Sequence, residues 1–275
     1  MINEGDEIPI HELDLSTIHP ISISDTEQGA KYIAIGAPGK GKSKIIENIM
    51  YYKKHIIPVG HVFSGTDESN MFFSKFFPSS FIFNDSDLSK YIDEKDKNTE
   101  LYNKNAVVQF KERQILARNY LLPNNTNPWA IEVFDDCTAD PKYLKKPIIQ
   151  DLYKNGRHWM MMHISTYQFC LDLPSNIRSN VNGIFIMKEG NPNQRERLFK
   201  NFSDGGIDKY EFDYIMDEIT EDWTSMYINK RSVSSRIDDT IMYYKADLDV
   251  VKDFKFGSKE FWDFHYQRVE DNNRL

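Results

Sequence analysis

Short apolar segments alternate with amphipathic segments along most of the chain. The apolar segments are rich in Ile, Val, Phe and Tyr, which favour extended structure. They predict strands at residues 31–37, 56–64, 80–84, 129–134, 158–166 and 183–187. Between them, apolar side chains recur at helical spacing, as at Ile45, Ile49 and Met50. Strands that alternate with helices predict an α/β fold with a mainly parallel sheet flanked by helices.

The amphipathic segments predict helices at residues 45–54, 87–94, 103–122, 141–155, 193–202, 208–218 and 258–269. Asn84, Asp85 and Ser86 suit the N-cap of the second helix, and Gly156 is the expected C-terminal stop of the fourth. Residues 224–229 and 240–246 predict a hairpin that adds edge strands. We therefore expect an N-terminal arm at 1–30, a core at 31–220 and a C-terminal extension at 221–275 packed on that core.

The composition narrows the class of protein. The 34 basic and 42 acidic residues give a net charge of −8, which argues against a uniformly basic, nucleic-acid-coating surface but allows a local basic patch. Two cysteines, Cys137 and Cys170, cannot form a disulfide framework or a Cys₄ zinc site. No apolar run is long enough to span a bilayer, and the acidic N-terminus lacks the pattern of a signal peptide. These features indicate a soluble protein of cytosolic type.

A glycine-rich turn follows the first strand and precedes a helix. It reads Gly36-Ala37-Pro38-Gly39-Lys40-Gly41-Lys42-Ser43 and fits the phosphate-binding loop G-x-x-x-x-G-K-[ST], or Walker A motif. Glycines allow successive backbone N–H groups to curl around phosphate oxygens, and the helix directs its positive end at them. Lys42 is expected to reach the β- and γ-phosphates of ATP, and the Ser43 hydroxyl to bind Mg²⁺.

An acidic pair, Asp135-Asp136, ends the strand at 129–134, where ligands collect in parallel sheets. We expect Asp135 to hold Mg²⁺ as a Walker B carboxylate, and Asp136 to polarise the attacking water. Many hydrolytic ATPases have Glu at this second position, so Asp136 is one methylene shorter than usual. Glu132, within the strand, is interpreted as structural. The long separation from Ser43 leaves room for a strand between the loop strand and the acidic strand.

Two further groups, a polar sensor and an arginine, could complete a hydrolytic site. Gln168 or Thr166, at the end of the strand at 158–166, could contact the γ-phosphate and the water. Arg157 lies after the helix that follows the acidic strand, where an arginine can reach a neighbouring subunit's nucleotide, and Arg178 is its rival. The segment Asn229-Lys230-Arg231-Ser232 lacks the Asp of the guanine signature, which favours ATP over GTP.

The ordered set of motifs resembles a known family. It is similar to the poxvirus-type genome-packaging ATPases of the FtsK–HerA superfamily of P-loop NTPases. The segments that carry the resemblance are, in order, KYIAI followed by GAPGKGKS, then IEVFDD, NGRHW, STYQF and LPSNIRSNVNGIFI. The resemblance runs from about Lys31 to Phe199. It implies a RecA/ASCE-like fold and a homo-oligomeric ring, of six subunits, that hydrolyses ATP with Mg²⁺ and pumps double-stranded DNA into a capsid.

The resemblance also implies roles and partners. Lys42 and Ser43 match the loop lysine and the Mg²⁺ hydroxyl, and Asp135-Asp136 match the acidic pair. Gln168 matches the polar sensor, and Arg157 matches an arginine finger that acts in trans. Capsid or portal-vertex proteins are the implied partners, and the host cytoplasm, at the site of virus assembly, and the virion are the implied locations. No motif matches the region after about Phe202.

Two other functions fit the loop. One is a P-loop nucleotide or small-molecule kinase, although the Asp-Asp pair and Gln168 speak for hydrolysis rather than transfer. The other is a scaffold locked by its nucleotide, which the intact Lys42 and Ser43 make less favoured. For a motor, candidate DNA contacts are two basic runs that are also typical of solvated helix faces: Lys142, Lys145 and Lys146, or Arg195, Arg197 and Lys200.

Overall fold

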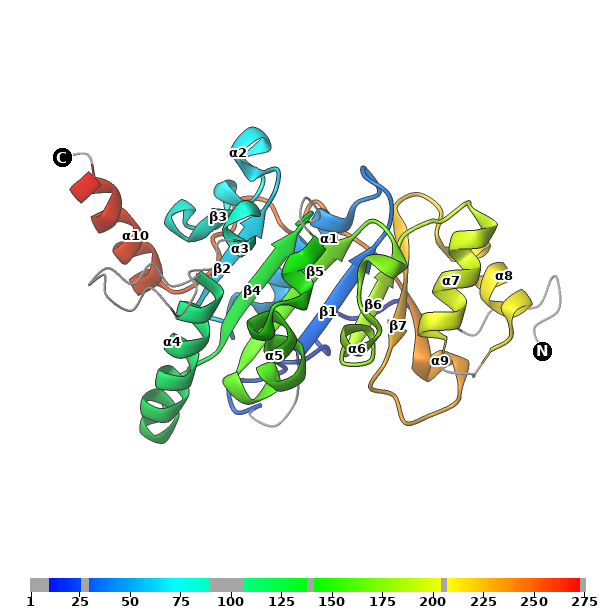
Figure 1. Cartoon of the computed structure of the whole chain (residues 1–275), viewed down its shortest axis with the longest axis horizontal. Coiled ribbons are helices and arrows are strands. Elements are labelled where there is room, and N and C mark those ends of the chain that lie inside the picture. Colours follow the sequence, from blue (N-terminus) through cyan, green and yellow to red (C-terminus); the bar gives the residue numbers. More distant parts are fainter. Residues whose placement is uncertain (1–9, 26–29, 90–105, 138–140, 204–206, 273–275) are drawn as a thin grey trace. The chain divides into compact units, whose positions relative to one another are not determined.

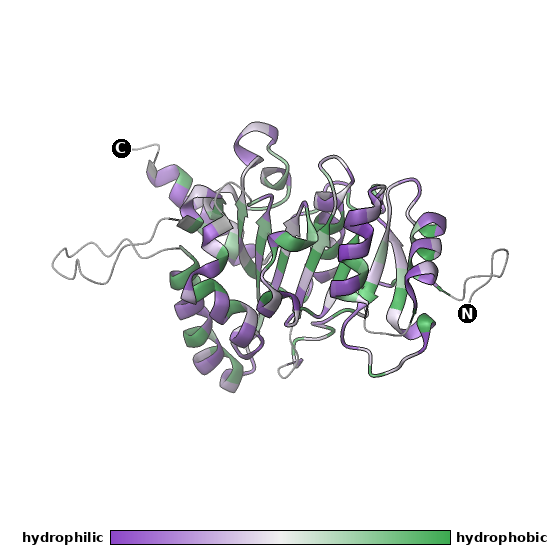
Figure 2. Cartoon of the chain, turned by 45° about the vertical axis from the view of Figure 1, so that its right-hand side comes forward, coloured by the Kyte–Doolittle hydropathy of each residue, from purple (hydrophilic) through white to green (hydrophobic). Residues whose placement is uncertain are grey.

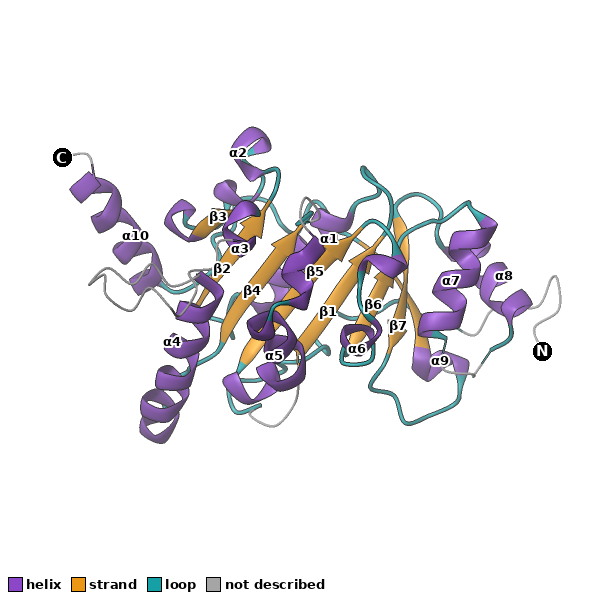
Figure 3. Cartoon of the chain, viewed as in Figure 1, coloured by secondary structure: helices purple, strands orange, loops and turns teal. Residues whose placement is uncertain are grey.

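Strands β1 to β8 form one mostly parallel sheet flanked by helices, in the order β3-β2-β4-β5-β1-β6-β7-β8 (Figures 1 and 3). This computed structural model describes residues 10–25, 30–89, 106–137, 141–203 and 207–272. The strands are β1 Ala30–Ile35, β2 Val59–Ser64, β3 Ile82–Asn84, β4 Ala130–Asp135, β5 Met161–Tyr167, β6 Gly183–Ile186, β7 Thr224–Asn229 and β8 Ile241–Lys245.

The pairing of the strands confirms the expected α/β fold class. β1 pairs with β6, and β2 with β3 and β4, all in parallel. β7 pairs antiparallel with β6 and with β8, so the predicted C-terminal hairpin adds strands at one edge of the sheet. The register sets Ser64 opposite Asp135, which brings the carboxyl ends of β2 and β4 to the same level.

Helices connect the strands. They are α1 Lys42–Lys53, α2 Asp67–Asn70, α3 Ser86–Ser89, α4 Ala106–Leu121, α5 Pro147–Asn155, α6 Ser175–Arg178, α7 Pro192–Phe202, α8 Lys209–Ile219, α9 Ile237–Thr240 and α10 Lys259–Asn272. The helices carry hydrophilic and hydrophobic residues together, as expected of elements with one buried face (Figure 2). Among the described residues, none of these helices has the length and apolarity that crossing a membrane requires.

The chain divides into two units by its contacts. Unit 1 comprises Met1–Ile18, Lys31–Tyr52 and Ile164–Lys252, and unit 2 comprises His19–Ala30, Lys53–His163 and Asp253–Leu275. The two units are interleaved in sequence, since β5 begins in unit 2 and ends in unit 1. The β7–β8 hairpin belongs to unit 1 and α10 to unit 2.

In unit 1, helices cover a buried parallel pair, β1 and β6. Every residue of both strands is buried, as is typical of parallel strands covered on both faces. On α1 the predicted apolar side is buried, with Ile46, Ile49 and Met50 all at 0% exposure. α7 and α8 contact each other through Phe199 and Phe212, whose ring centroids are 5.7 Å apart.

In unit 2, aromatic side chains dominate the core. Phe63 of β2 meets Phe134 of β4 edge to face at 5.3 Å. The segment that leads into α10 is held by Phe256, whose N–H donates to Phe76 O at 2.8 Å. The ring of Phe256 stacks on that of Phe77 at 5.5 Å. α4 is fixed by buried Gln114, whose amide donates to Pro128 O and Trp159 O.

Several predicted boundaries are wrong for local reasons. The helix predicted at 141–155 is a 3₁₀ turn, Pro141–Lys145, followed by α5, because Pro147 has no N–H to continue a helix. The C-terminal boundary is correct, because α5 ends at Asn155 with Gly156 as its C-cap, but the cap is not left-handed: the φ of Gly156 is −54°, and a 3₁₀ turn, Gly156–Trp159, continues the chain. The left-handed residue is Met160 (φ 54°), so β5 begins three residues later than predicted.

Other boundaries depend on hydrogen bonds that the apolar pattern does not show. The N–H groups of Ile56 and Ile57 both donate to Lys53 O at 2.9 Å, so they close α1 instead of opening β2. In the N-terminal segment, Leu13 N–H donates to Tyr243 O on β8 at 2.8 Å, a contact between residues that are far apart in the sequence. Residues 1–9 of the arm, 90–94 of one predicted helix and 103–105 of another lie outside the described residues.

Candidate functional site

The glycine-rich loop connects β1 to α1 in unit 1, and its glycines are required for two different reasons. Gly39 and Gly41 have φ of +75° and +95°, a left-handed backbone that residues with a side chain rarely adopt. Gly36 is required by space, because a Cβ there would lie 2.5 Å from Met187 Cβ on the residue after β6. The backbone therefore has the curvature that phosphate recognition by N–H groups needs.

Lys42 and Ser43 form the first turn of α1, at the end where the helix dipole is positive. Lys42 is 9% exposed, and its ammonium donates to Gly36 O at 2.6 Å and to Ala37 O at 3.1 Å. Lys42 therefore folds back over the start of the loop. The loop runs directly into the helix, and Ile45 N–H already donates to Gly41 O at 3.2 Å.

The carboxyl end of β5 meets the start of the loop within unit 1. Gly36 N–H donates to Tyr167 O at 3.1 Å. Gln168 is the next residue and is half-buried, whereas the Thr166 side chain is buried within the strand. Gln168 is therefore one residue away from the backbone group that contacts the start of the loop. Of the two expected sensor residues, Gln168 is the less buried.

In unit 2, Asp135 is the last residue of β4 and Asp136 the first after it. Asp135 is 4% exposed, and its carbonyl accepts from Gly65 N–H at 3.3 Å. Asp136 has φ +53°, an uncommon value for a residue with a side chain. A Cβ on Gly65 would lie 3.0 Å from Asp136 O, so the β2 turn runs close beneath the acidic pair. This turn holds Asp136 in a defined backbone conformation.

A third carboxylate shares this neighbourhood and was missed by sequence reasoning. Burial, and then the negative charges of Asp135, Asp85 and Asp136, hold the pKa of the Cys137 thiol well above its usual range. The thiol donates weakly to Phe63 O at 3.4 Å. Asp85 follows β3, which pairs in parallel with β2. Its position directly after a strand was the feature of the sequence that could have indicated this third carboxylate. The side chain of Asn84, the last residue of β3, accepts from Ser86 N–H at 3.0 Å, and α3 begins at Ser86, one residue earlier than the predicted helix.

The two candidate arginines lie at the amino ends of strands. Arg157 is exposed in the 3₁₀ turn before β5, and its Nε donates to His158 Nε2 at 3.2 Å. Gln168 follows the other end of β5, roughly 20 Å along a seven-residue strand. Arg178, in α6, donates to Leu173 O and so holds its own turn together. Arg157 precedes β5 and Arg178 precedes β6, so both lie at amino ends of strands. The loop, in contrast, follows the carboxyl end of β1.

A cavity of about 520 Å³ borders the loop in unit 1, and sequence reasoning missed it. Its lining comes from three distant segments, the loop, the end of β6 and the turn between α8 and β7: Pro38, Gly39, Lys40, Met187, Lys188 and Thr220–Thr224. No single stretch of sequence carries this signal.

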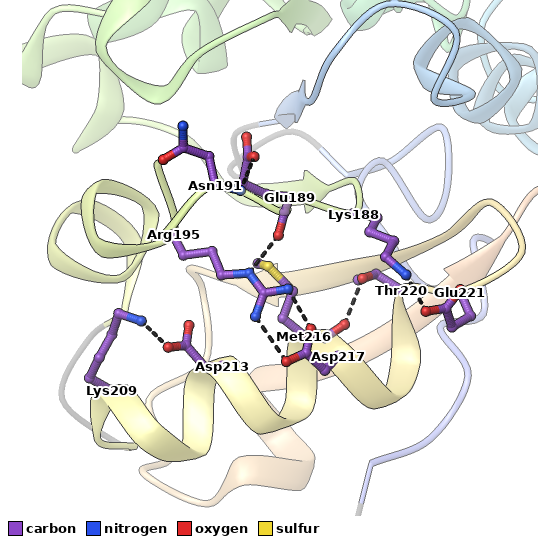
Figure 4. A network of polar contacts seen from close by, with 10 residues as sticks. All are labelled: Lys188, Glu189, Asn191, Arg195, Lys209, Asp213, Met216, Asp217, Thr220 and Glu221. Atoms are coloured by element: carbon purple, nitrogen blue, oxygen red, sulfur yellow. Dashed lines mark hydrogen bonds and ion pairs between the residues drawn. The ribbon is translucent and has the colours of Figure 1, made fainter. Parts of the chain in front are cut away.

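A polar network holds the elements beside this cavity (Figure 4). Arg195 of α7 forms a bidentate pair with Asp217 of α8, and this hydrogen bonding lowers the pKa of Asp217. Lys188, after β6, pairs with Glu221. Thr220 Oγ1 donates to Met216 O at 2.6 Å and closes α8. Arg195, a candidate DNA contact, is therefore engaged within its own subunit.

The chain is similar in sequence to proteins of invertebrate iridescent viruses. No protein-family model matches it. The protein 088R of Invertebrate iridescent virus 3 is 38% identical over 95% of each chain, and 075L of Invertebrate iridescent virus 6 is 34% identical over 98% of each; both are described as uncharacterised.

Solved structures share the fold at low identity. The genome packaging NTPase B204 of Sulfolobus turreted icosahedral virus 2 has a TM-score of 0.52 at 18% identity and covers 80% of this chain and 98% of its own. ATPases 2 and 3 of EssC from Geobacillus thermodenitrificans have a TM-score of 0.51 at 12% identity, covering 90% of this chain and 45% of theirs. The fold expected from the resemblance to FtsK–HerA ATPases is confirmed. By its sequence, the chain belongs to the family of viral proteins that includes 088R and 075L of the invertebrate iridescent viruses.

Proposed function

We propose that the chain is an ATP-hydrolysing motor that moves double-stranded DNA into a viral capsid. The observation that carries this proposal is the loop Gly36–Ser43, in which left-handed glycines turn the backbone into the N-terminal end of α1. This arrangement suits an anionic phosphate chain. The fold shared with a viral genome packaging NTPase supports the choice of motor among the many functions of such loops.

The residues of the loop fit a nucleoside triphosphate with Mg²⁺. Lys42 would exchange its bonds to Gly36 O and Ala37 O for the β- and γ-phosphates. Ser43, and Asp135 through the ion's water shell, would hold Mg²⁺. Bound Mg·ATP supplies the phosphoanhydride bond whose cleavage drives the motor. B204, at a TM-score of 0.50, has been solved with ATP-gammaS, which supports a nucleotide at this loop.

The remaining candidate residues would carry hydrolysis. Asp136 would accept a proton from the attacking water, and Gln168, with Thr166 as the alternative, would orient that water. Arg157 lies at the amino end of β5 and is exposed, so it is available to a neighbouring subunit. In a ring it would neutralise charge on the neighbour's transferring phosphate, with Arg178 as the alternative.

The proposed substrate is the DNA backbone and not a base sequence. A few cations lining a central channel suffice for sequence-independent binding, and a net charge of −8 leaves the rest of the surface acidic. We propose a ring of six copies, which would assemble that lining. The viral relatives support action in an infected cell. We place the chain at the cytoplasmic assembly site and in the virion, with capsid or portal-vertex proteins as partners.

The experiment is an ATPase assay on purified protein with and without double-stranded DNA, with the mass in solution measured under ATP. We expect turnover that DNA stimulates and a mass several times 32.3 kDa. Lys42→Ala, which removes the loop ammonium, is the negative control. DNA-independent turnover by a strict monomer would contradict the motor, and phosphate transfer to an added nucleotide would indicate the kinase instead.

A further inference from the structure

We propose that the cavity beside the loop binds the base of the nucleotide, and that Trp223 stacks on it. This inference rests on the proposed nucleotide function, because the phosphates fix where the rest of the ligand lies. The cavity measures about 520 Å³, within the roughly 300–1,000 Å³ range of small-molecule sites. It opens along Pro38, Gly39 and Lys40 of the loop itself, so a ligand held there by its phosphates can extend into it.

Trp223 lies directly against the loop. A Cβ built on Gly41 would be 3.7 Å from Trp223 Cδ1 and 3.6 Å from Met187 Cε, which is ordinary contact distance. The Trp223 side chain is nevertheless 66% exposed, whereas large aromatic side chains are usually mostly buried. An indole that touches a phosphate-binding loop and leaves much of its surface open offers a stacking face for a planar ring.

The backbone that presents Trp223 is strained. Asp222 and Trp223 are consecutive residues with side chains and have φ of 49° and 60°. Such values cost free energy and persist only where the surroundings impose them. Here Thr224 N–H donates to Glu221 O at 2.9 Å, which closes the turn over the two strained residues.

Two ion pairs join this turn to neighbouring segments of unit 1. Glu221 pairs with Lys188 after β6, and Asp222 pairs with Lys245 of β8. These pairs engage the two carboxylates of the turn, so the flat, apolar surface offered to a ligand is the indole, with Met187 and Pro38 beside it. An aromatic face with an apolar surround suits a nucleobase better than a phosphate or a metal ion.

The test separates the base from the phosphates by comparing two ligands. Calorimetry measures the binding of Mg·ATP and of Mg·tripolyphosphate to the full chain and to Trp223→Ala, with Tyr210→Ala, an exposed aromatic on α8, as the matched control. We expect Trp223→Ala to weaken ATP binding roughly 5- to 150-fold, the range of base–aromatic stacking, and to leave tripolyphosphate binding unchanged. Tyr210→Ala should bind both ligands as the unaltered chain does.

Unchanged ATP binding in Trp223→Ala, or an equal loss for both ligands, overturns the base pocket and leaves the nucleotide function standing. Failure of the unaltered chain to bind either ligand overturns the nucleotide function itself.

Trp223→Phe guards against misfolding, because it keeps an aromatic face. It should bind ATP nearly as well but lose any change in tryptophan fluorescence on ATP addition, whereas Trp262→Phe, in unit 2, should keep that change. A fluorescence change that persists in Trp223→Phe contradicts the proposal.

Discussion

His163 donates to Glu132 across 2.9 Å between β5 and β4, and both side chains are almost completely buried. His61 Nε2 contacts the other carboxylate oxygen of Glu132 at 2.8 Å. His163 Nε2 accepts from Tyr153 OH at 2.9 Å, an assignment that follows from the partners. The His61 ring stacks on Phe110 with centroids 3.8 Å apart. Glu132 is therefore the centre of a structural network, in agreement with its interpretation from the sequence.

This network predicts an acid-sensitive contribution to stability. Burial acts to raise the pKa of Glu132, but the hydrogen bonds from His163 and His61 outweigh it and the pKa is lowered. A carboxylate with a lowered folded-state pKa contributes stability above its unfolded value of about 4.3, and loses it as the pH falls through the folded value. Glu132→Gln should lower the free energy of unfolding at pH 7 by about 1.5–3 kcal/mol.

Urea titrations at pH 7 and at pH 3.5 measure this difference. The deficit of Glu132→Gln should shrink at the lower pH, because the unaltered chain then loses the same charged interaction. Glu218→Gln, at an exposed position of α8, is the control and should change stability by less than about 0.5 kcal/mol. A Gln variant as stable as the unaltered chain at pH 7 would show that the network contributes nothing.

Lys42→Ala should remove nucleotide binding and turnover together. The ammonium is held by the carbonyls of Gly36 and Ala37, at the point where the phosphates would lie, so no other described cation of the loop has its position. Calorimetry with Mg·ATP measures binding, and phosphate release measures turnover. Lys75→Ala, an exposed lysine of unit 2, is the matched control. ATP binding by Lys42→Ala at unaltered affinity and rate would refute the role of the loop.

Asp136→Asn should bind ATP nearly normally and hydrolyse it roughly 10²- to 10⁴-fold more slowly, the range for loss of a general base. The backbone at this residue has φ +53°, and asparagine adopts that region readily. The variant therefore removes the charge without a new backbone strain. Single-turnover hydrolysis, with binding measured separately, distinguishes the two effects. Full activity would remove Asp136 from the mechanism and leave the role to another carboxylate, such as the neighbouring Asp85.

Arg157→Ala should abolish turnover, by about 10³- to 10⁵-fold for an arginine finger, while ATP still binds. Because Arg157 lies at the amino end of β5, it should act in trans. Mixing it with Lys42→Ala should then restore part of the activity, since mixed interfaces combine an intact arginine with an intact loop. Absence of rescue in assemblies of normal mass would favour Arg178 or a role within one subunit.

The control for that experiment is Arg178→Ala. The guanidinium of Arg178 donates to Leu173 O, so its removal should lower the melting temperature as well as any activity. Arg157 is exposed and donates to the exposed His158, so its loss should leave the melting temperature unchanged. Thermal unfolding of both variants separates a catalytic loss from a structural one.

The parts of the fold that could be predicted are those set by nearby residues. The buried apolar side of α1 and the edge hairpin follow from spacing along one segment. The errors arise where one backbone hydrogen bond or dihedral angle decides, as at Met160 and Ile57. Apolar residues fit a strand and a helix end equally well there, and the pattern does not distinguish them.

The candidate site shows the same division. The loop Gly36–Ser43 has a local signature, because the phosphate chain that we propose for it would be bound by consecutive backbone groups. The cavity at Trp223 and the Glu132 network combine segments that are far apart in the sequence, and each residue taken alone looks ordinary. Asp85 is intermediate: its place after β3 was visible, but its closeness to Cys137 depends on the pairing of β2 with β3.

The close approach of Gly36 to Met187 has a mechanical consequence. Even one added carbon at position 36 would collide with Met187 Cβ at 2.5 Å, so the end of β1 packs tightly against the end of β6. Met187 N–H also donates to Ile35 O at 2.9 Å, just before the loop. Through the ion pair of Lys188 with Glu221, the end of β6 is also joined to the turn before β7, so the loop, the end of β6 and that turn form one connected set of contacts.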